Sequence, residues 1–261
     1  MAKVQKRSLL IVWRDVIFAI FLREIKSKFN DKFGIAWSVI SPLAFIFMLS
    51  YIRERMDGGD THGIPTFWFV VYGMMLVQFF LGLIESVSNA IQKNKPLYAF
   101  RQVQPISSVI AIAGFELLIK FFVILTILMI TYYLHMETQI ADPIEVILII
   151  LRVWLIATSL GILISLAKCY VPEVGKIQSL AMRPVFFISG IFFSLQDIPQ
   201  EYWHYLTWNP LLHAVELARF AAYPQYGNAG VSYFFLDSAT IICVFFALAC
   251  YQISWKQAIS R

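Results

Sequence analysis

The sequence is dominated by six apolar stretches, each long enough to cross a lipid bilayer as a helix. A transmembrane helix needs about 20 consecutive, mostly apolar residues. The six stretches occupy residues 34–52, 66–88, 108–134, 144–168, 178–195 and 233–254. Because the bilayer interior cannot satisfy free backbone N–H and C=O groups, single stretches of this length cross it as helices. The sequence therefore predicts an all-α integral membrane protein with six transmembrane helices.

The composition agrees with a membrane protein and excludes several other classes. Apolar residues make up 59% of the chain and charged residues only 14%, whereas a soluble domain is about half apolar and about a quarter charged. A disordered chain and a small disulfide-stabilised domain are therefore excluded. The net charge of +5 does not indicate a nucleic-acid partner, because basic residues of membrane proteins gather in cytoplasmic loops.

Lys and Arg gather in every second connection between the apolar stretches. The segments 1–32, 89–105 and 168–183, together with the C-terminal tail, hold 16 of the 21 basic residues. The alternate connections, which are 53–65, 135–143 and 196–232, hold three. Cytoplasmic loops carry the basic excess in membrane proteins, so we expect both termini to be cytoplasmic. The even number of predicted spans agrees with this orientation.

The basic N-terminal segment also has a helical apolar pattern. We expect residues 1–32 to contain a cytoplasmic amphipathic interface helix, with the transmembrane domain in residues 33–261. Such a helix could be a membrane anchor alone, or it could also be a docking surface for a partner. Its apolar positions recur every three or four residues at Leu9, Leu10, Trp13, Ile17, Phe18, Phe21, Leu22 and Ile25.

The connection 196–232 is too long and too mixed for a simple loop. Pro199 and Pro210 can each begin a helix, and neither helix would be long enough to cross the bilayer. We therefore expect short re-entrant helices on the outer side, between the fifth and sixth spans. Re-entrant segments are tolerated at membrane depth only where protein or a water-filled cavity covers them, so this region indicates a translocation path.

The residues give no indication of a catalytic centre, a metal site or a bound cofactor. The sequence contains no G-x-x-x-x-G-K-[ST] phosphate loop, no H-E-x-x-H and no G-x-S-x-G. The three cysteines lack the spacing of metal ligands, and we expect no disulfide between them. The four histidines are scattered over the predicted outer connections, at His62, His135, His204 and His213.

Few charged residues fall within the predicted spans, and we expect them to form ion pairs. Glu116 and Lys120 are four residues apart in the third span, with the acid first, which is the favourable order on a helix. Arg152 and Asp237 lie at similar depths in the fourth and sixth spans. An unpaired charge at such a depth is costly, so we expect these two residues to meet.

Aromatic residues make up 16% of the chain. Many fall at the ends of spans, where an aromatic belt at the membrane interface accounts for them. The alternative is that aromatic faces along a conduit stack against sugar rings. The first and fifth spans carry the better candidates for a conduit, which are Trp37, Phe45, Tyr51, Phe186, Phe187, Phe192 and Phe193.

Three segments resemble the permeases of ABC-2 type exporters. A basic interface helix followed by Gly34, Trp37 and Pro42 is similar to the family's approach to its first span. The run I-P-x-x-Y-W-x-Y-L-x-W-N-P-L-x-H-x-V-E-L-x-R within 186–219 is similar to the fifth span and outer helices of the capsular polysaccharide exporters. The segment 92–106 resembles the cytoplasmic loop of that subfamily. The likeness extends over essentially the whole chain.

The resemblance implies how such a subunit is assembled. Residues 33–261 would form an ABC-2 type transmembrane domain. Two copies would pair, and each would engage a separate ATPase subunit that binds ATP and Mg, which agrees with the missing phosphate loop. The interface helix and the 89–105 connection would contact the ATPases. The residues expected to dock there are Lys93, Lys95, Tyr98 and Arg101.

The resemblance also implies a substrate and a path. The first and fifth spans would line the conduit, and the outer re-entrant helices would close it. A lipid-linked capsular polysaccharide would leave the cytoplasm across the bacterial inner membrane, among membrane lipid, and periplasmic and outer-membrane export proteins would carry it onward. The residues expected at the outer gate are Tyr202, Trp203, Trp208, Asn209 and Pro210.

Three alternatives remain open from the sequence. The exported substrate could be another glycopolymer, such as O-antigen or teichoic acid, or a drug. The chain could be a membrane enzyme or a proton-coupled carrier, which would need acid–base groups facing a cavity within the membrane. It could also be a membrane scaffold without transport. Copurification with an ATPase, and ATP hydrolysis only in the assembled complex, would separate an exporter from the other two classes.

Overall fold

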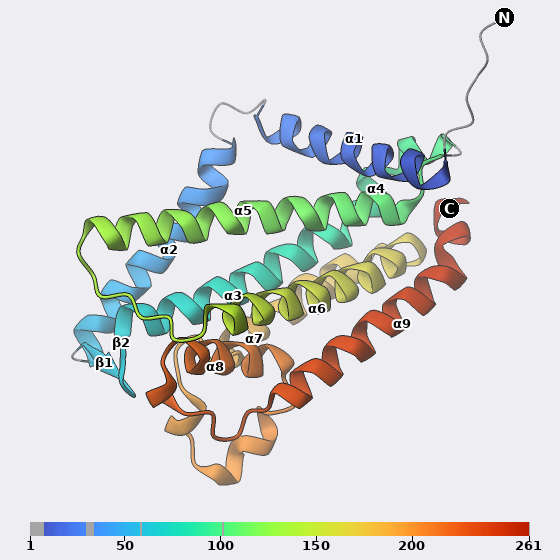
Figure 1. Ribbon diagram of the computed structural model, residues 1–261. Coiled ribbons are helices and arrows are strands. Elements are labelled where there is room, and N and C mark those ends of the chain that lie inside the picture. The colour runs from blue at the N-terminus through green and yellow to red at the C-terminus, as the bar shows by residue number, and fades with distance from the viewer. Residues whose placement is uncertain (1–7, 30–33, 58, 101, 261) are drawn as a thin grey trace, which may run out of the picture.

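The computed structural model describes residues 8–29, 34–57, 59–100 and 102–260, and it is almost entirely helical (Figure 1). The α-helices are α1 (Leu9–Phe29), α2 (Gly34–Asp57), α3 (Thr66–Ser88), α4 (Ala90–Lys93), α5 (Pro105–Tyr133), α6 (Pro143–Tyr170), α7 (Val174–Ile188), α8 (Pro210–Ala222) and α9 (Tyr233–Ser260). Shorter 3₁₀ turns are η1 (Lys95–Ala99), η2 (Leu195–Asp197), η3 (Gln200–Tyr205) and η4 (Pro224–Tyr226).

One small hairpin departs from the predicted all-α fold. Strands β1 (Asp60–Thr61) and β2 (Ile64–Pro65) pair antiparallel between α2 and α3. The two residues of the turn, His62 and Gly63, have φ angles of 52° and 80°, as two-residue hairpin turns with positive φ require. Two strands of two residues each are too short to be recognised from an apolar alternation in the sequence.

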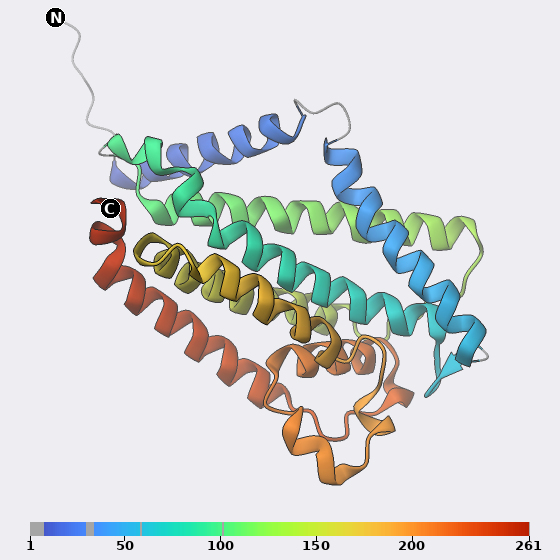
Figure 2. The same cartoon turned by 180° about the vertical axis from the view of Figure 1, so that it is seen from behind.

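Helix α3 is the centre of the bundle. Most of its side chains are buried, and it packs against α2, α5, α6 and α8. A helix that is apolar all round belongs in the interior of a bundle. Figure 1 and Figure 2 show α2 crossing α3 and α5 at one side of the bundle, while α9 lies along α6 at the other.

Four described helices are long and apolar enough to cross a membrane. They are α3, α5, α6 and residues Tyr233–Ile259 of α9. Helix α2, which contains the predicted first span, and helix α7, which contains the first part of the predicted fifth span, do not meet that condition. The last turns of α2 carry Arg53, Glu54 and Arg55. Helix α7 has 15 residues, which gives a length of about 22 Å, short of the roughly 30 Å hydrocarbon core.

The predicted fifth span, 178–195, ends earlier than expected. Helix α7 stops at Ile188 and is followed by Gly190, whose φ of 75° is incompatible with a continuing right-handed helix. A Cβ on Gly190 would lie 2.7 Å from Cδ1 of Leu212 on α8. The chain therefore turns here to bring the end of α7 against α8.

The predicted N-terminal helix is present as α1, which packs against α5. The rings of Phe21 and Phe115 meet edge to face, with their centroids 6.2 Å apart. Only part of the apolar pattern is covered, because Trp13, Phe18 and Leu22 remain exposed. Helix α1 thus has one apolar side against the bundle and further apolar side chains facing outward.

Candidate functional site

Aromatic rings from α2 and α7 meet in one cluster. The ring centroid of Phe45 on α2 lies 6.4 Å from that of Phe186 on α7. The Phe186 ring is 5.3 Å from that of Phe187 and 5.9 Å from that of Phe192, which follows the end of α7. These four residues, here called the ring cluster, are four of the seven aromatic residues expected to line a conduit. Edge-to-face and tilted contacts at such distances stabilise one another.

Two open clefts flank the ring cluster. One has a volume of ≈ 470 Å³ and runs along α2 from Trp37 to Met48. The other has a volume of ≈ 730 Å³ and lies between α3 and α7, ending at Phe186 and Phe187. The exposed fractions of Trp37 and Phe187 are 65% and 61%. The face that holds the ring cluster and both clefts, here called the conduit wall, therefore leaves aromatic rings accessible from outside the subunit.

Three of the expected conduit residues lie apart from the ring cluster. Trp37 lines the α2 cleft. Tyr51 accepts a hydrogen bond from Nη2 of Arg55 at 3.2 Å, and the same guanidinium lies 5.3 Å from the centre of its ring. Phe193 lies beyond α7, where its carbonyl oxygen accepts a hydrogen bond from Nη1 of Arg219 at 3.5 Å.

The segment between α7 and α9 forms a cap over one end of the bundle. Two of the expected gate residues begin helix α8 within this cap. Oδ1 of Asn209 accepts a hydrogen bond from the backbone N–H of Leu211 at 3.0 Å, and Pro210 is the first helical residue. Nδ2 of Asn209 donates to Oγ of Ser189 at 3.2 Å. Asn209 thus satisfies a free helix-end donor and ties α8 to the end of α7.

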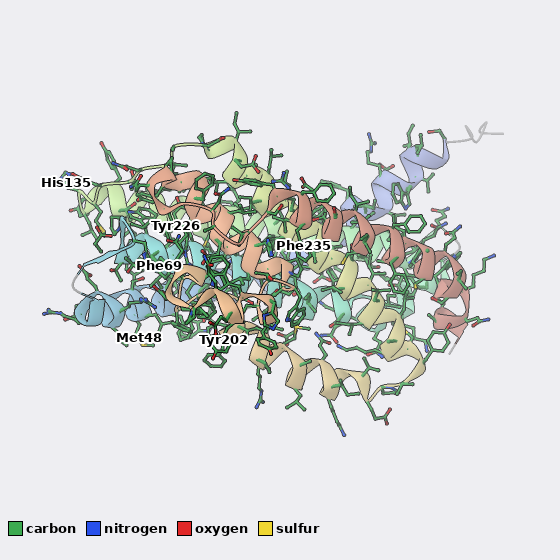
Figure 3. All side chains as sticks on the ribbon, turned by 90° about the horizontal axis from the view of Figure 1, so that it is seen from below. Met48, Phe69, His135, Tyr202, Tyr226 and Phe235 are labelled. Atoms are coloured by element: carbon green, nitrogen blue, oxygen red, sulfur yellow. The ribbon has the colours of Figure 1, made fainter. Side chains whose placement is uncertain are left out.

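Of the other three expected gate residues, Trp203 is held in place by the cap, whereas Tyr202 and Trp208 are exposed. Nε1 of Trp203 donates to the carbonyl of Ile198 at 2.8 Å, and the ring fills the space beside Gly230. Tyr202 and Trp208 are exposed, and Figure 3 shows Tyr202 on the cap as seen from that end. Of these three aromatic residues, Tyr202 and Trp208 can therefore contact a molecule outside the subunit.

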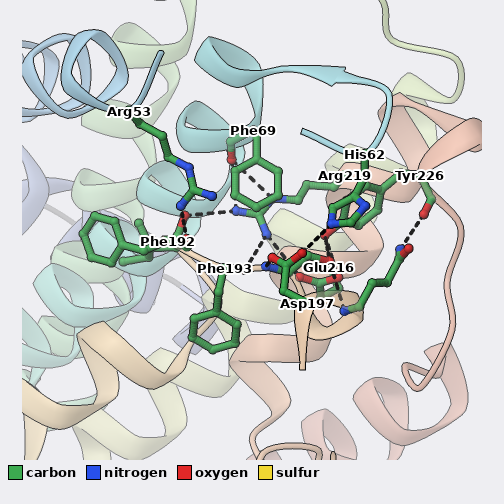
Figure 4. A network of polar contacts seen from close by, with 12 residues as sticks. Arg53, His62, Phe69, Phe192, Phe193, Asp197, Glu216, Arg219 and Tyr226 are labelled. Atoms are coloured by element: carbon green, nitrogen blue, oxygen red, sulfur yellow. Dashed lines mark hydrogen bonds and ion pairs between the residues drawn. The ribbon is translucent and has the colours of Figure 1, made fainter. Parts of the chain in front are cut away.

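A fully buried arginine holds the cap on the bundle (Figure 4). Arg219 on α8 is 0% exposed. Its Nη2 and Nε both donate to the carbonyl of Phe69 on α3, at 3.0 and 3.2 Å, and Nη2 also donates to the carbonyl of Ile191 at 3.3 Å. Its Nη1 lies 3.1 Å from Oε1 of Glu216, one helical turn earlier. A charge is tolerated in such a place only when it is paired and hydrogen-bonded.

The contacts of Arg219 extend into a wider polar network. Oε2 of Glu216 lies 2.8 Å from the hydroxyl of Tyr226, which lies 2.6 Å from Oγ of Ser194. The guanidinium of Arg53 on α2 donates to the carbonyl of Phe192 and lies 5.1 Å from the ring centre of Phe69. We call this set, together with Asp197 and His62, the outer network. It joins α2, α3, α8 and the chain that follows α7.

Asp197 and His62 connect the hairpin to the cap. Nε2 of His62 lies 2.6 Å from Oδ1 of Asp197, and the backbone N–H of Ser194 donates to Oδ2 at 2.8 Å. Partial burial raises the pKa of Asp197, but the Ser194 N–H and the His62 imidazole outweigh burial and hold this pKa below its usual value. The ionised carboxylate therefore stabilises the outer network.

One of the two expected ion pairs within the spans is present, and the other is not. Nε of Arg152 lies 2.6 Å from Oδ1 of Asp237, and its Nη1 lies 2.7 Å from Oε1 of Glu145. In the described part of the chain, no ion pair joins Glu116 to Lys120. Glu116 instead accepts a hydrogen bond from Oγ of Ser86 at 2.7 Å, and Nζ of Lys120 lies 5.8 Å from the centre of the Phe79 ring. Partners on α3 thus replace the local pairing.

The expected ATPase-docking residues have unequal access to a partner. Nζ of Lys93 lies 2.5 Å from Oε2 of Glu24 on α1. Tyr98 is buried and donates to Oγ of Ser108 at 3.1 Å, and burial raises its pKa to about 12. Lys95 is exposed, and Arg101 lies outside the described residues. The structure thus leaves Lys95 open at this surface and gives Lys93 and Tyr98 contacts within the subunit.

Sequence reasoning missed the outer network. The spacing of Glu216 and Arg219, three residues apart in the second half of a short and largely apolar helix, was a signal that a buried ion pair could form. The partners on other elements carried no such signal, because Arg219 bonds a backbone carbonyl 150 residues away in the chain. Backbone acceptors are the same for every residue type and cannot be read from a sequence.

The sequence is similar to a known transporter family and to several named proteins. The family described as ABC-2 type transporter matches residues 15–223. The polysialic acid transport protein KpsM of Escherichia coli is 32% identical over 251 residues, which cover 92% of this chain and 94% of the relative. The capsule polysaccharide export inner-membrane protein CtrC of Neisseria meningitidis serogroup A is 26% identical, with 80% of each chain covered.

A third relative is also named for capsule polysaccharide export. The capsule polysaccharide export inner-membrane protein BexB of Haemophilus influenzae is 23% identical, over 87% of this chain and 85% of the relative. The family match includes α2, α3, α5, α6, α7 and α8 in full, and therefore the conduit wall and all of the outer network except Tyr226. These sequence matches show that this chain belongs to the ABC-2 type transporter family.

Proposed function

We propose that this chain is the permease subunit of an ABC exporter that moves a lipid-linked capsular polysaccharide out of the cytoplasm. The proposal rests on one observation. Most of the chain is similar in sequence to relatives named for polysialic acid transport and capsule polysaccharide export. The subunit itself is not an enzyme. A separate ATPase subunit binds ATP and Mg and supplies the energy.

The proposed arrangement places six helices across the bacterial inner membrane. Helices α2 and α7 join the four apolar helices as spans. A partner subunit covers the polar end of α2 and the short helix α7. Residues 33–261 then form one transmembrane domain, and α8 with its 3₁₀ turns is the outer re-entrant cap. The distribution of Lys and Arg supports a cytoplasmic position for α1, α4 and the end of α9. Both termini are then cytoplasmic.

Two copies of the subunit pair so that their conduit walls face each other. A polar polymer cannot cross hydrocarbon, so it needs a continuous lined path. The ring cluster and Trp37 offer flat faces that can stack against successive sugar rings and release them again. The paired copies also account for the apolar area that one copy leaves exposed on α2 and α7.

The ATPases act through the cytoplasmic surface of α1 and the segment 90–100. Exposed Lys95 and Phe100 are the residues of this segment best placed to touch a partner. The pairing of Lys93 with Glu24 links α4 to α1, and both helices pack against α5. When the ATPases close on each other, they tilt the two permease copies as rigid bodies, and the cap opens toward periplasmic and outer-membrane export proteins.

A test in cells separates export from the alternatives. A strain that lacks this subunit should keep its polymer in the cytoplasm, and the wild-type subunit should restore polymer at the cell surface. A strain with an ATPase that binds ATP but cannot hydrolyse it should fail in the same way. Surface polymer that forms without the subunit, or without ATP hydrolysis, would contradict the proposal. The sugar composition of the retained polymer distinguishes capsule from O-antigen or teichoic acid.

A further inference from the structure

The larger cleft of the conduit wall has two ends of different chemistry. Helix α7 lines this α3–α7 cleft with one face, from Gln178 to Phe187, and α3 and α6 supply the opposite side. Near α4, the lining is polar and includes Glu85, Asn89, Lys168, Gln178 and Ser179, and Arg183 follows about one turn later on α7. Toward the ring cluster, the lining is apolar and includes Leu81, Met182, Phe186 and Phe187. A molecule that fills the cleft therefore needs a polar head and a part that packs against aromatic rings.

The polar end has hydrogen-bonding groups that the protein itself leaves unused. The side chain of Gln178 is buried, at 8% exposure, and its Oε1 has no hydrogen-bond partner among the described residues. Buried polar atoms almost always have a partner, so this acceptor indicates a missing donor. Nζ of Lys168 donates to Oγ of Ser88 and Oδ1 of Asn89, both at 2.9 Å, which occupies two of the three donors of an ammonium.

The charges of the cleft favour an acidic occupant. Arg183 is exposed at the cleft, and none of the ion pairs between described residues includes it. Lys168 is the second cation, and Glu85 is the one carboxylate among the lining residues. Two cations against one carboxylate leave an excess of positive charge. A guanidinium recognises phosphate or carboxylate through two parallel hydrogen bonds.

We infer that the α3–α7 cleft binds the acidic head of the lipid-linked substrate before the polymer reaches the ring cluster. Arg183 and Lys168 bind a phosphate or carboxylate group, Oε1 of Gln178 accepts a hydrogen bond from a sugar hydroxyl, and Phe186 and Phe187 receive the next ring. This inference rests on the proposed export function and on the cytoplasmic position of the polar end. It assigns the cleft to the substrate rather than to a bulk membrane lipid.

Binding of a simple acidic amphiphile tests the site directly. Dodecyl phosphate is titrated into the purified permease–ATPase complex in a neutral detergent, and Arg183→Gln should weaken its binding about tenfold. Glu85→Gln should tighten binding, because it removes the one acid of the cleft. Lys176→Gln is the matched control, since Lys176 is an exposed cation of the same helix that does not line the cleft.

Other ligands separate the possible sources of the anion. Inorganic phosphate and zwitterionic dodecylphosphocholine should each bind more weakly than dodecyl phosphate, because they lack the chain or the net charge. Equal binding of inorganic phosphate or of dodecylphosphocholine would overturn the inference. So would an Arg183→Gln variant that binds dodecyl phosphate as well as the Lys176→Gln variant does.

An assay in cells distinguishes failure of this site from failure of the proposed function. In a strain that lacks the native subunit, Arg183→Gln should leave polymer inside the cell at normal permease abundance, while Lys176→Gln should restore surface polymer. If the wild-type subunit itself restores no surface polymer, the export function is wrong. If the wild-type subunit restores it and both variants equal the wild type, only the cleft assignment is wrong.

Discussion

The outer cap and the conduit wall are built in opposite ways. In the outer network, Arg219 is fully buried and its donors meet carbonyl or carboxylate oxygens from several elements. On the conduit wall, aromatic side chains such as Trp37 and Phe187 remain exposed beside open clefts. The cap is fixed by directional bonds within one chain, whereas the wall has few such bonds and leaves aromatic rings accessible beside the clefts. This difference separates the part that must hold its shape from the part that must bind and release.

The largest effect is expected from removing the buried charge of the cap. Arg219→Leu should lower the free energy of unfolding by about 3–5 kcal/mol, because it leaves Glu216 as a buried carboxylate without its cation. Thermal unfolding of the purified permease in detergent measures the loss. Arg55→Leu is the control, since Arg55 is exposed on α2. Equal losses in the two variants would show that Arg219 does not hold the cap.

The turn after α7 should be the next most sensitive position. Gly190→Ala should cost about 1–3 kcal/mol, because Gly190 has a φ of 75° and an added Cβ would lie 2.7 Å from Leu212. Gly82→Ala on α3 is the matched control, since an added Cβ there meets nothing within 4 Å. Unfolding temperatures of the two variants compare the sites. If Gly82→Ala lowered the unfolding temperature as much as Gly190→Ala does, the turn at Gly190 would not specifically require glycine.

On the conduit wall, substitution should affect transport more than stability. Phe187→Ala should lower polymer export about two- to tenfold at unchanged permease abundance, since an aromatic contact contributes about 0.5–1.5 kcal/mol. Phe245→Ala is the matched control, because Phe245 is an exposed phenylalanine on α9, away from the clefts. Surface polymer per permease molecule is the quantity to measure. If abundance and export fell together, Phe187 would be a packing residue.

The smallest effect concerns the pH dependence of the cap. The pKa of Asp197 is lowered in the folded protein, so the folded state gains stability where the group is ionised in both states. That gain is present above the usual carboxylate pKa of about 4 and is lost as the pH falls through the lower folded value. Asp197 is partly exposed, so the gain should stay below about 1 kcal/mol.

Asp197→Asn tests this dependence. The unfolding temperature of the variant should fall less steeply than that of the wild type as the pH drops from about 5 to about 3. Glu201→Gln, on the exposed turn η3, should leave the wild-type slope unchanged. If the unfolding temperatures of the wild type and of the Asp197→Asn variant fell in parallel with pH, the ionised carboxylate of Asp197 would not stabilise the outer network.

The sequence predicted those features that depend on one helix at a time. Apolar stretches of about 20 residues located α3, α5, α6 and α9, and the cost of an unpaired charge within a membrane anticipated the contact of Arg152 with Asp237. The early end of α7 escaped prediction because it depends on the packing of Gly190 against Leu212. Glu116 and Lys120 form no close ion pair among the described residues, where Glu116 instead accepts a hydrogen bond from Ser86 on another helix.

The same limit applies to the candidate site. Aromatic residues on the first and fifth predicted spans were identified from the sequence, but only the structure shows which of their rings touch. Four meet in the ring cluster, while Phe193 lies at the outer network. For Asn209 and Pro210, expected at the gate, the structure shows a local role in beginning α8. Asn and Pro occur both at the starts of helices and at gates, so the sequence alone cannot tell which of these two roles Asn209 and Pro210 have.

Contact between the polymer and the conduit wall is the most direct measurement. A photoreactive phenylalanine analogue at position 187 or at position 245 is introduced into the permease, and crosslinks are collected in cells that export polymer. The polymer should crosslink at position 187 only when the ATPase can hydrolyse ATP, and lipid alone should crosslink at position 245. Polymer captured equally at both positions, or at neither during active export, would contradict a path along α2 and α7.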